Sequence, residues 1–194
     1  MKLLYGLLFL ISATASAYDL TDALEGIIYR TGNKIYFKST GDFQYYKIRP
    51  TNAYVNRDIQ QLESGDSLEA SGYLEKSKSI FHIDSVHFVG LKKILGVWKD
   101  QTNNLFQFVN FEKLTVYLRP STNRVHSMSS DYTPVKSFQY TITPNPSNDW
   151  SILINDNLSI QTGNLEFEKN NIKIHFINSE TGEITKTVTL QRVF

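Results

Sequence analysis

The chain has 194 residues, of which 41% are hydrophobic, with 20 basic and 19 acidic side chains and no cysteine. The lack of cysteine excludes disulfides, thiolate catalysis and cysteine-based metal sites. The balanced charge lacks the basic excess with which proteins follow a phosphate backbone, so we expect no nucleic-acid partner.

The first seventeen residues have the pattern of a secretory signal peptide. The basic Lys2 precedes an apolar run over residues 3–11, and an A-x-A cleavage site ends at Ala17. The apolar run is too short to span a bilayer. We therefore expect residues 1–17 to be removed, and a mature chain from Tyr18 that is periplasmic or secreted and has no transmembrane segment.

The next segment, residues 18–93, reads as strands around one short helix. Its apolar residues mostly alternate with a period of two, which is typical of β-strands. Asn56 is a suitable N-cap for the helix. The predicted elements in chain order are strands over 24–30, 34–38 and 43–49, a helix over 56–62, and strands over 67–74 and 80–89.

This order of elements resembles the OB-fold, a five-stranded Greek-key barrel. The run SGDSLEASGYL over residues 64–74, followed by IDSV at residues 83–86, is similar to a pattern common in OB barrels, G-D-x-L-x-x-x-G-x-L and then I-x-S-V. An SH3-like barrel is the alternative. The resemblance implies that oligonucleotides or oligosaccharides bind across the second and third strands.

Tyr36, Tyr45, Tyr46 and Arg49 lie on those two strands and are the candidate ligand-binding residues of the first barrel. Aromatic rings beside basic residues hold single-stranded nucleic acid, but the neutral charge favours a glycan or a peptide. Because successive side chains of a strand point to opposite faces, we expect about half of these rings to fill the core.

The last segment, residues 94–194, opens with a G-x-W motif at Gly96 and Trp98 and ends with Arg192. These motifs resemble lipocalin-like barrels, in which the tryptophan closes one end and a basic residue of the last strand packs over it as a cation–π contact. Between the motifs, short strands alternate with turns and a polar loop at 120–134. The predicted strands are 96–98, 105–110, 113–118, 135–143, 150–154, 158–161, 165–168, 172–177 and 185–193.

An eight- to nine-stranded barrel of this size has room for core side chains or for one small ligand. Tyr140 and Trp150 are the candidate residues for lining its interior, and filling the core is the other interpretation. The small size argues against a large cavity for an apolar ligand.

No catalytic, metal or cofactor site is predicted. The motifs H-x-H, H-E-x-x-H and G-x-S-x-G are absent, as is a phosphate-binding glycine loop. His82 and His87 are separated by an odd number on one strand, so they point to opposite faces unless a bulge intervenes. Glu166 and Glu168 share a face, as glycosidase carboxylates do, but Lys173 lies near and a solvated face is the simpler interpretation.

The sequence thus predicts an all-β protein with an OB-like barrel and a lipocalin-like barrel in tandem, joined by a short junction at residues 90–93. We expect a non-enzymatic binding or adaptor protein of the periplasm or cell envelope. Its partner is a protein, a glycan or a small apolar ligand. The alternatives are a carrier of small apolar ligands in the second barrel and an inhibitor of an envelope enzyme.

Overall fold

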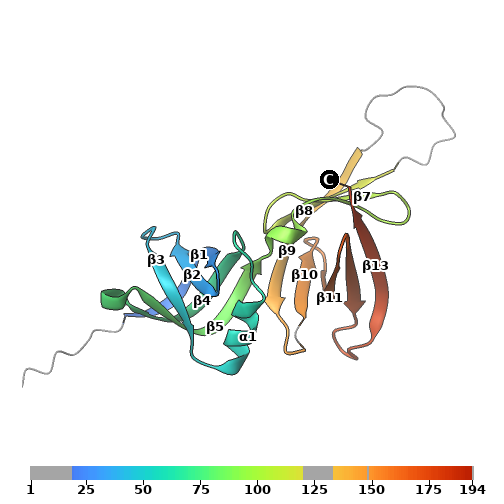
Figure 1. Cartoon of the computed structure of the whole chain (residues 1–194). Helices are drawn as coiled ribbons and strands as arrows, with labels where there is room; N and C mark the ends of the chain where they lie inside the picture. Colours follow the sequence, from blue (N-terminus) through green and yellow to red (C-terminus); the bar gives the residue numbers. More distant parts are fainter. Residues whose placement is uncertain (1–18, 120–132, 148, 194) are drawn as a thin grey trace, which may run out of the picture.

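The computed structural model describes residues 19–119, 133–147 and 149–193. It consists of two closed β-barrels that lie side by side, with the first formed entirely by the N-terminal half (Figure 1). The predicted all-β fold with two tandem barrels is confirmed. The expected signal peptide and most of the 120–134 loop lie outside the described residues. In the described ranges, no helix has the length and apolar character needed to cross a membrane.

The first barrel has the strand order β1-β2-β3-β5-β4, which closes on β1 and is the order of an OB-fold. All neighbouring strands run antiparallel except β3 and β5, which are parallel because α1 and β4 intervene. Its elements are β1 (Asp19–Thr31), β2 (Lys34–Ser39), β3 (Tyr45–Pro50), α1 (Ala53–Gln60), β4 (Ser67–Glu75) and β5 (Ile80–Gly90).

The helix α1 begins three residues earlier than predicted, so the expected N-cap at Asn56 is wrong. Asn52 is the cap, since its backbone is extended and its Oδ1 accepts a hydrogen bond from the Val55 N–H at 2.9 Å. Capping needs a residue just outside the helix, and Asn56 lies inside it. Val55 and Ile59 are buried and fix α1 to the barrel.

Strand β5 contains two bulges, and these overturn the expected placement of its histidines. The register of β5 against β4 shifts once between Glu69 and Ala70 and again between Ser71 and Gly72. Each bulge adds a residue that breaks the alternation of faces. As a result, His82 and His87 both lie on the outer face, where His82 stacks on Tyr73 at 4.2 Å and the His87 Nε2 lies 2.9 Å from the Ser71 Oγ.

The second barrel has eight strands, all antiparallel to their neighbours, in an up-and-down order that closes where β13 meets β6. The predicted strands at 158–161 and 165–168 form one continuous strand, because Gly163 and Asn164 pair within it rather than turn. Its strands are β6 (Gly96–Lys99), β7 (Leu105–Phe108), β8 (Lys113–Leu118), β9 (Thr133–Pro144), β10 (Trp150–Asn155), β11 (Ile160–Glu168), β12 (Asn171–Ile177) and β13 (Ile184–Arg192).

The G-x-W motif and Arg192 meet as the sequence predicts. The Arg192 guanidinium lies 4.6 Å from the centre of the Trp98 ring, and the two residues are direct neighbours across β6 and β13. The Trp98 Nε1 donates to the Ile94 carbonyl at 2.7 Å, while the Arg192 Nη2 donates to the Lys93 carbonyl at 2.5 Å. The pair therefore ties the start of the second barrel to its last strand.

The two barrels are in direct contact. Arg57 of α1 donates hydrogen bonds to the carbonyls of Asn145 and Pro146, at 3.2 and 2.8 Å. At the junction, the Asp66 Oδ1 accepts from the Lys92 N–H at 2.7 Å. Strand β5 also packs against β9. These contacts join residues of the two barrels that are far apart in the chain.

Candidate functional site

The predicted binding residues of the first barrel divide between its outer face and its core. Tyr45 is 50% exposed and Arg49 is exposed, whereas Tyr36 is half-buried. Tyr46 points inward, and its hydroxyl donates to the Asp42 carboxylate. Burial and this carboxylate raise the pKa of Tyr46 to about 12. Tyr46 is therefore a structural residue rather than part of an exposed binding surface.

Tyr29 of β1 joins the exposed residues, although the sequence reasoning considered only the second and third strands. Its ring lies edge-on to Tyr45 with the centroids 5.4 Å apart, and it pairs across strands with Tyr36. The Lys38 Nζ lies 5.4 Å from the Tyr45 ring, and Lys47 pairs with Tyr36. We call these five residues the tyrosine face. Arg49 is further along β3, beside His82.

The predicted interior residues of the second barrel belong to its packed core. Tyr140 is 2% exposed and Trp150 is 3% exposed. The Tyr140 hydroxyl donates to the Asn110 carbonyl at 2.7 Å, and its ring packs edge-on against Phe108. Burial raises the pKa of Tyr140 above its usual value. Both side chains are thus packed against protein atoms, and neither is open to a ligand inside the barrel.

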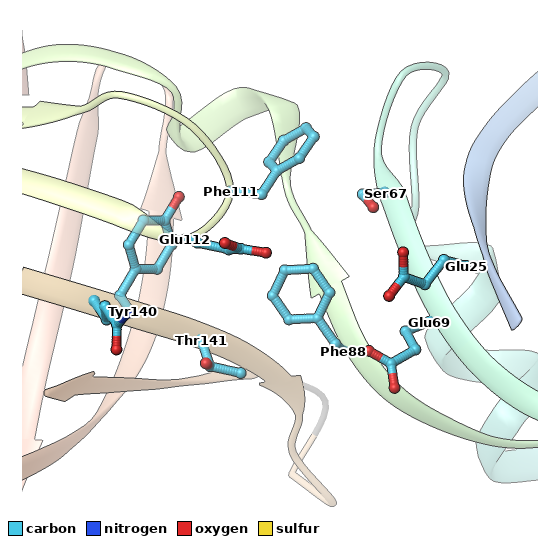
Figure 2. Close-up of a pocket in the computed structure, with 9 residues that line it drawn as sticks. Glu25, Ser67, Glu69, Phe88, Phe111, Glu112, Tyr140 and Thr141 are labelled. Carbon is cyan, nitrogen blue, oxygen red and sulfur yellow. The ribbon is translucent and has the colours of Figure 1, made fainter. Parts of the chain in front are cut away.

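A cleft of about 410 Å³ lies between the two barrels (Figure 2). The first barrel contributes Glu25 from β1, Glu69 from β4 and Phe88 from β5. The second contributes Phe111 and Glu112, which form the turn between β7 and β8. Clefts at domain interfaces are preferred positions for binding sites, and here each side of the cleft comes from a different barrel.

Three carboxylates face this cleft without a basic residue among its lining. Glu25 and Glu69 are direct neighbours across β1 and β4. Like charges placed opposite each other on two strands destabilise a sheet. Glu112 approaches from the other side, as Figure 2 shows. Within the described part of the chain, none of the three carboxylates has an ion-pair partner.

The aromatic wall of the cleft is held in place by close packing at the junction. A Cβ atom on Gly90 would lie 2.4 Å from the Cγ atom of Phe111, so only glycine allows that ring to lie against the end of β5. Phe88 and Phe111 are both half-buried and present ring surface between the carboxylates (Figure 2). Aromatic faces attract cations and pack against aliphatic stems. The arrangement therefore suits a positively charged group on an apolar stem.

Comparison with models of protein families, with curated protein sequences and with solved structures gives no significant match to this chain.

Of the binding residues predicted from the sequence, Tyr140 alone lines the cleft, and the three carboxylates were not predicted. Glu25 and Glu69 are 44 positions apart, and only the β1–β4 register brings them together. Glu112 joins them through the contact between barrels. A sequence signal existed only in part, because outward positions of β1 and β4 are predictable from the alternation of each strand, whereas their pairing is not.

Two hydrogen-bonded clusters on the outer faces combine an imidazole with hydroxyls. The His175 Nδ1 lies 3.0 Å from the Thr187 Oγ1, and its Nε2 lies 3.2 Å from the Glu166 Oε2. Lys173 forms ion pairs with Glu166 and Glu168, as the interpretation of a solvated face predicts. Among the described residues, no group of three potential ligands is arranged to hold a metal ion. The second hydrogen-bonded cluster joins the imidazole of His87 to the hydroxyls of Ser71 and Ser85.

Proposed function

We propose that the protein is an exported, non-enzymatic adaptor of the periplasm or cell envelope, which binds a lysine or arginine side chain of a protein partner in the cleft between its barrels. The observation that supports this proposal is the meeting of Glu25, Glu69 and Glu112 around two phenylalanine rings. Export is supported by the signal-peptide pattern of residues 1–17.

The chemistry of the cleft favours a cation with a long stem. A lysine or arginine stem gains apolar contact with Phe88 and Phe111, while its head reaches the carboxylates. Hydrogen bonds between a charged donor and a carboxylate are about twice as strong as neutral ones. A bound cation also relieves the repulsion between Glu25 and Glu69, which face each other across two strands. A neutral polar ligand leaves the repulsion between the two carboxylates in place, and an anionic ligand adds to it.

The direct test uses a blocked Gly-Arg-Gly tripeptide as the probe and follows the ring resonances of Phe88 and Phe111 by NMR. We expect saturable shifts with the arginine peptide and none with the same peptide carrying neutral citrulline. Combining Glu69→Gln with Glu112→Gln should abolish the shifts, whereas Glu180→Gln, an exposed residue of the second barrel, should leave them unchanged. Equal shifts with citrulline, or shifts that persist in the double variant, would contradict the proposal.

The repulsion in the cleft has a measurable effect on the protein without ligand. We expect Glu69→Gln to raise the free energy of unfolding of the first barrel by about 0.2–1 kcal/mol, because it removes a like-charge pair between opposed strand residues. Chemical denaturation followed by circular dichroism measures this change. Glu180→Gln is the control and should have no effect. A loss of stability in Glu69→Gln would show that its carboxylate has a favourable partner.

A second candidate function is glycan binding on the tyrosine face. Tyr29 and Tyr45 are 37% and 50% exposed, and their rings pack edge to face without a ligand. They therefore offer a preformed aromatic surface on which a sugar ring can stack. On a glycan array, we expect Tyr45→Ala to weaken the recognised glycan by about 5-fold or more, since buried tyrosine contacts contribute about 1 kcal/mol or more. Tyr54→Ala is the matched control, because Tyr54 is 71% exposed on α1. Equal loss in both variants would contradict this function.

Two other functions have less support. A carrier of apolar ligands needs an accessible interior in the second barrel, and the burial of Tyr140 and Trp150 among protein neighbours gives it no support. An inhibitor of an envelope enzyme depends on the loop at 120–134, of which residues 120–132 lie outside the described residues.

A further inference from the structure

Strands β2 and β3 of the first barrel pair over only half of their length. Each has six residues, but within the described chain the register joins only residues 36–38 to residues 45–47. Beyond this pairing the two strands separate, and a pocket of about 200 Å³ is lined there by both strands and by the end of α1. Its apolar lining consists of Ile35, Ile48, Pro50 and Ile59.

The polar side chains that line this pocket are basic or neutral. They belong to Lys34, Lys47, Asn33 and Gln60, and no acidic residue is among the lining. Both lysines are exposed, and in the described ranges neither of them forms an ion pair. A hollow lined by one sign of charge attracts ligands of the opposite sign. The pocket is therefore suited to an anionic group.

The backbone adds hydrogen-bond donors to the same pocket. The Ser39 N–H donates to the Gln44 carbonyl, on the β3 side of β2, and the Lys47 N–H donates on the β5 side of β3. Because backbone groups alternate between the two sides of a strand, the N–H groups of Ile35 and Ile48 are directed between β2 and β3. The strands have separated at that point, so the register gives neither group a partner there. An oxyanion can accept hydrogen bonds from both.

The end of α1 does not oppose an anion in this pocket. Carbonyl groups at a helix C-terminus carry partial negative charge, but here they are occupied by the guanidinium of Arg30. Its Nε donates to the Leu62 carbonyl at 2.5 Å. Its Nη2 donates to the carbonyls of Ile59 and Gln60, at 3.2 and 2.7 Å. The charge of the helix end is thus compensated without using either lysine of the pocket.

The pocket adjoins the tyrosine face. Lys47 belongs to both, and it pairs with Tyr36 across β2 and β3. Lys34 lies two residues before Tyr36 and therefore on the same side of β2. Tyr36 in turn pairs with Tyr29 across β1 and β2. A ligand whose ring lies on these tyrosines can therefore place a charged substituent beside both lysines.

We propose that this pocket binds the anionic group of an acidic polysaccharide whose sugar rings stack on the tyrosine face. The inference rests on the second candidate function, glycan binding, and deepens it by giving the glycan a negative charge. Hydrogen bonds between a charged donor and an anion are about twice as strong as neutral ones. A nucleic acid is the poorer match, because the rings of Tyr29 and Tyr45 meet at 68° and do not offer parallel platforms to successive bases.

Titration with trigalacturonate and with its fully methyl-esterified form tests the role of the charge, since the two carry the same rings. We expect the acidic form to shift the amide resonances of Ile35 and Ile48 and to bind about tenfold tighter, which is the usual size of one charged hydrogen bond. Combining Lys34→Gln with Lys47→Gln should remove this difference. Lys169→Gln, at an exposed position of the second barrel, should preserve it.

The outcomes separate this inference from glycan binding itself. Equal binding of the acidic and esterified forms would overturn the inference and leave glycan binding standing, as would a difference that persists in the double lysine variant. Binding of neither form would contradict both. Tighter binding of a thymidine octanucleotide than of trigalacturonate, lost in the same double variant, would assign the pocket to a nucleic-acid phosphate and would also overturn the inference.

Discussion

Replacing Trp98 with alanine should lower the free energy of unfolding of the second barrel by about 3–5 kcal/mol, as is typical for a buried aromatic side chain. Trp98 is 3% exposed, and its ring is covered by Arg192. The substitution removes this packing and the hydrogen bond to the Ile94 carbonyl at 2.7 Å. It also leaves the Arg192 guanidinium without the ring beneath it, at the place where the barrel closes.

Tryptophan fluorescence measures this loss selectively, because both tryptophans of the chain lie in the second barrel. In Trp98→Ala, the remaining Trp150 reports the unfolding midpoint of that barrel. Amide exchange of β1 and β4 reports the first barrel, which should be unaffected. Arg192→Lys is a graded control that keeps the charge but shortens the reach to the Lys93 carbonyl, so its effect should be smaller. An unchanged midpoint in Trp98→Ala would show that the motif does not close the barrel.

Replacing Gly72 with alanine should disrupt the first barrel and cost about 3 kcal/mol or more, at the upper end of overpacking effects. A Cβ atom at this position would lie 1.9 Å from the carbonyl oxygen of His82. The obstacle is backbone of the neighbouring strand, so no side-chain rotation can relieve it. Strands β4 and β5 must separate where Gly72 pairs with Ile83.

Amide exchange is the measurement for this variant, since protection in β4 and β5 should fall while the fluorescence midpoint of the second barrel stays unchanged. Gly32→Ala provides the matched control. Gly32 lies in a turn with a positive φ of 58°, and a Cβ atom there meets nothing within 4 Å. Its cost should be limited to about 1–2 kcal/mol for the left-handed backbone. Equal costs in the two variants would show that the close approach at Gly72 is not decisive.

The alternation of apolar residues and two short motifs were sufficient to predict both barrels. The G-x-W motif and Arg192 also predicted a contact between residues 94 positions apart, because the chemistry of that contact needs a ring and a cation. The errors have local causes. The bulges of β5 add residues that no period of two reveals, and the predicted break between residues 161 and 165 falls at Gly163 and Asn164, which lie within β11.

The candidate site was harder to predict than the fold. Tyr36 and Tyr45 were predicted as candidates on the second and third strands, without a face assigned to either, and Tyr29 joins them only through the pairing of β1 and β2. The glutamates of the cleft depend on strand register and on the contact between two domains. Neither is encoded in any short stretch of sequence. Residue types can be predicted from local pattern, whereas their meeting depends on the completed tertiary structure.

The position of Arg192 also determines when each half of the molecule can fold during synthesis. The first barrel is complete once Gly90 has emerged, because β5 is its last strand. The second cannot close until Arg192 has emerged, since β6 pairs with β13 only at Gln191 and Arg192. A chain that appears N-terminus first therefore presents a folded OB-like barrel while the other half is still open. A chain cut before Gln191 should keep the first barrel folded and leave the second barrel unfolded.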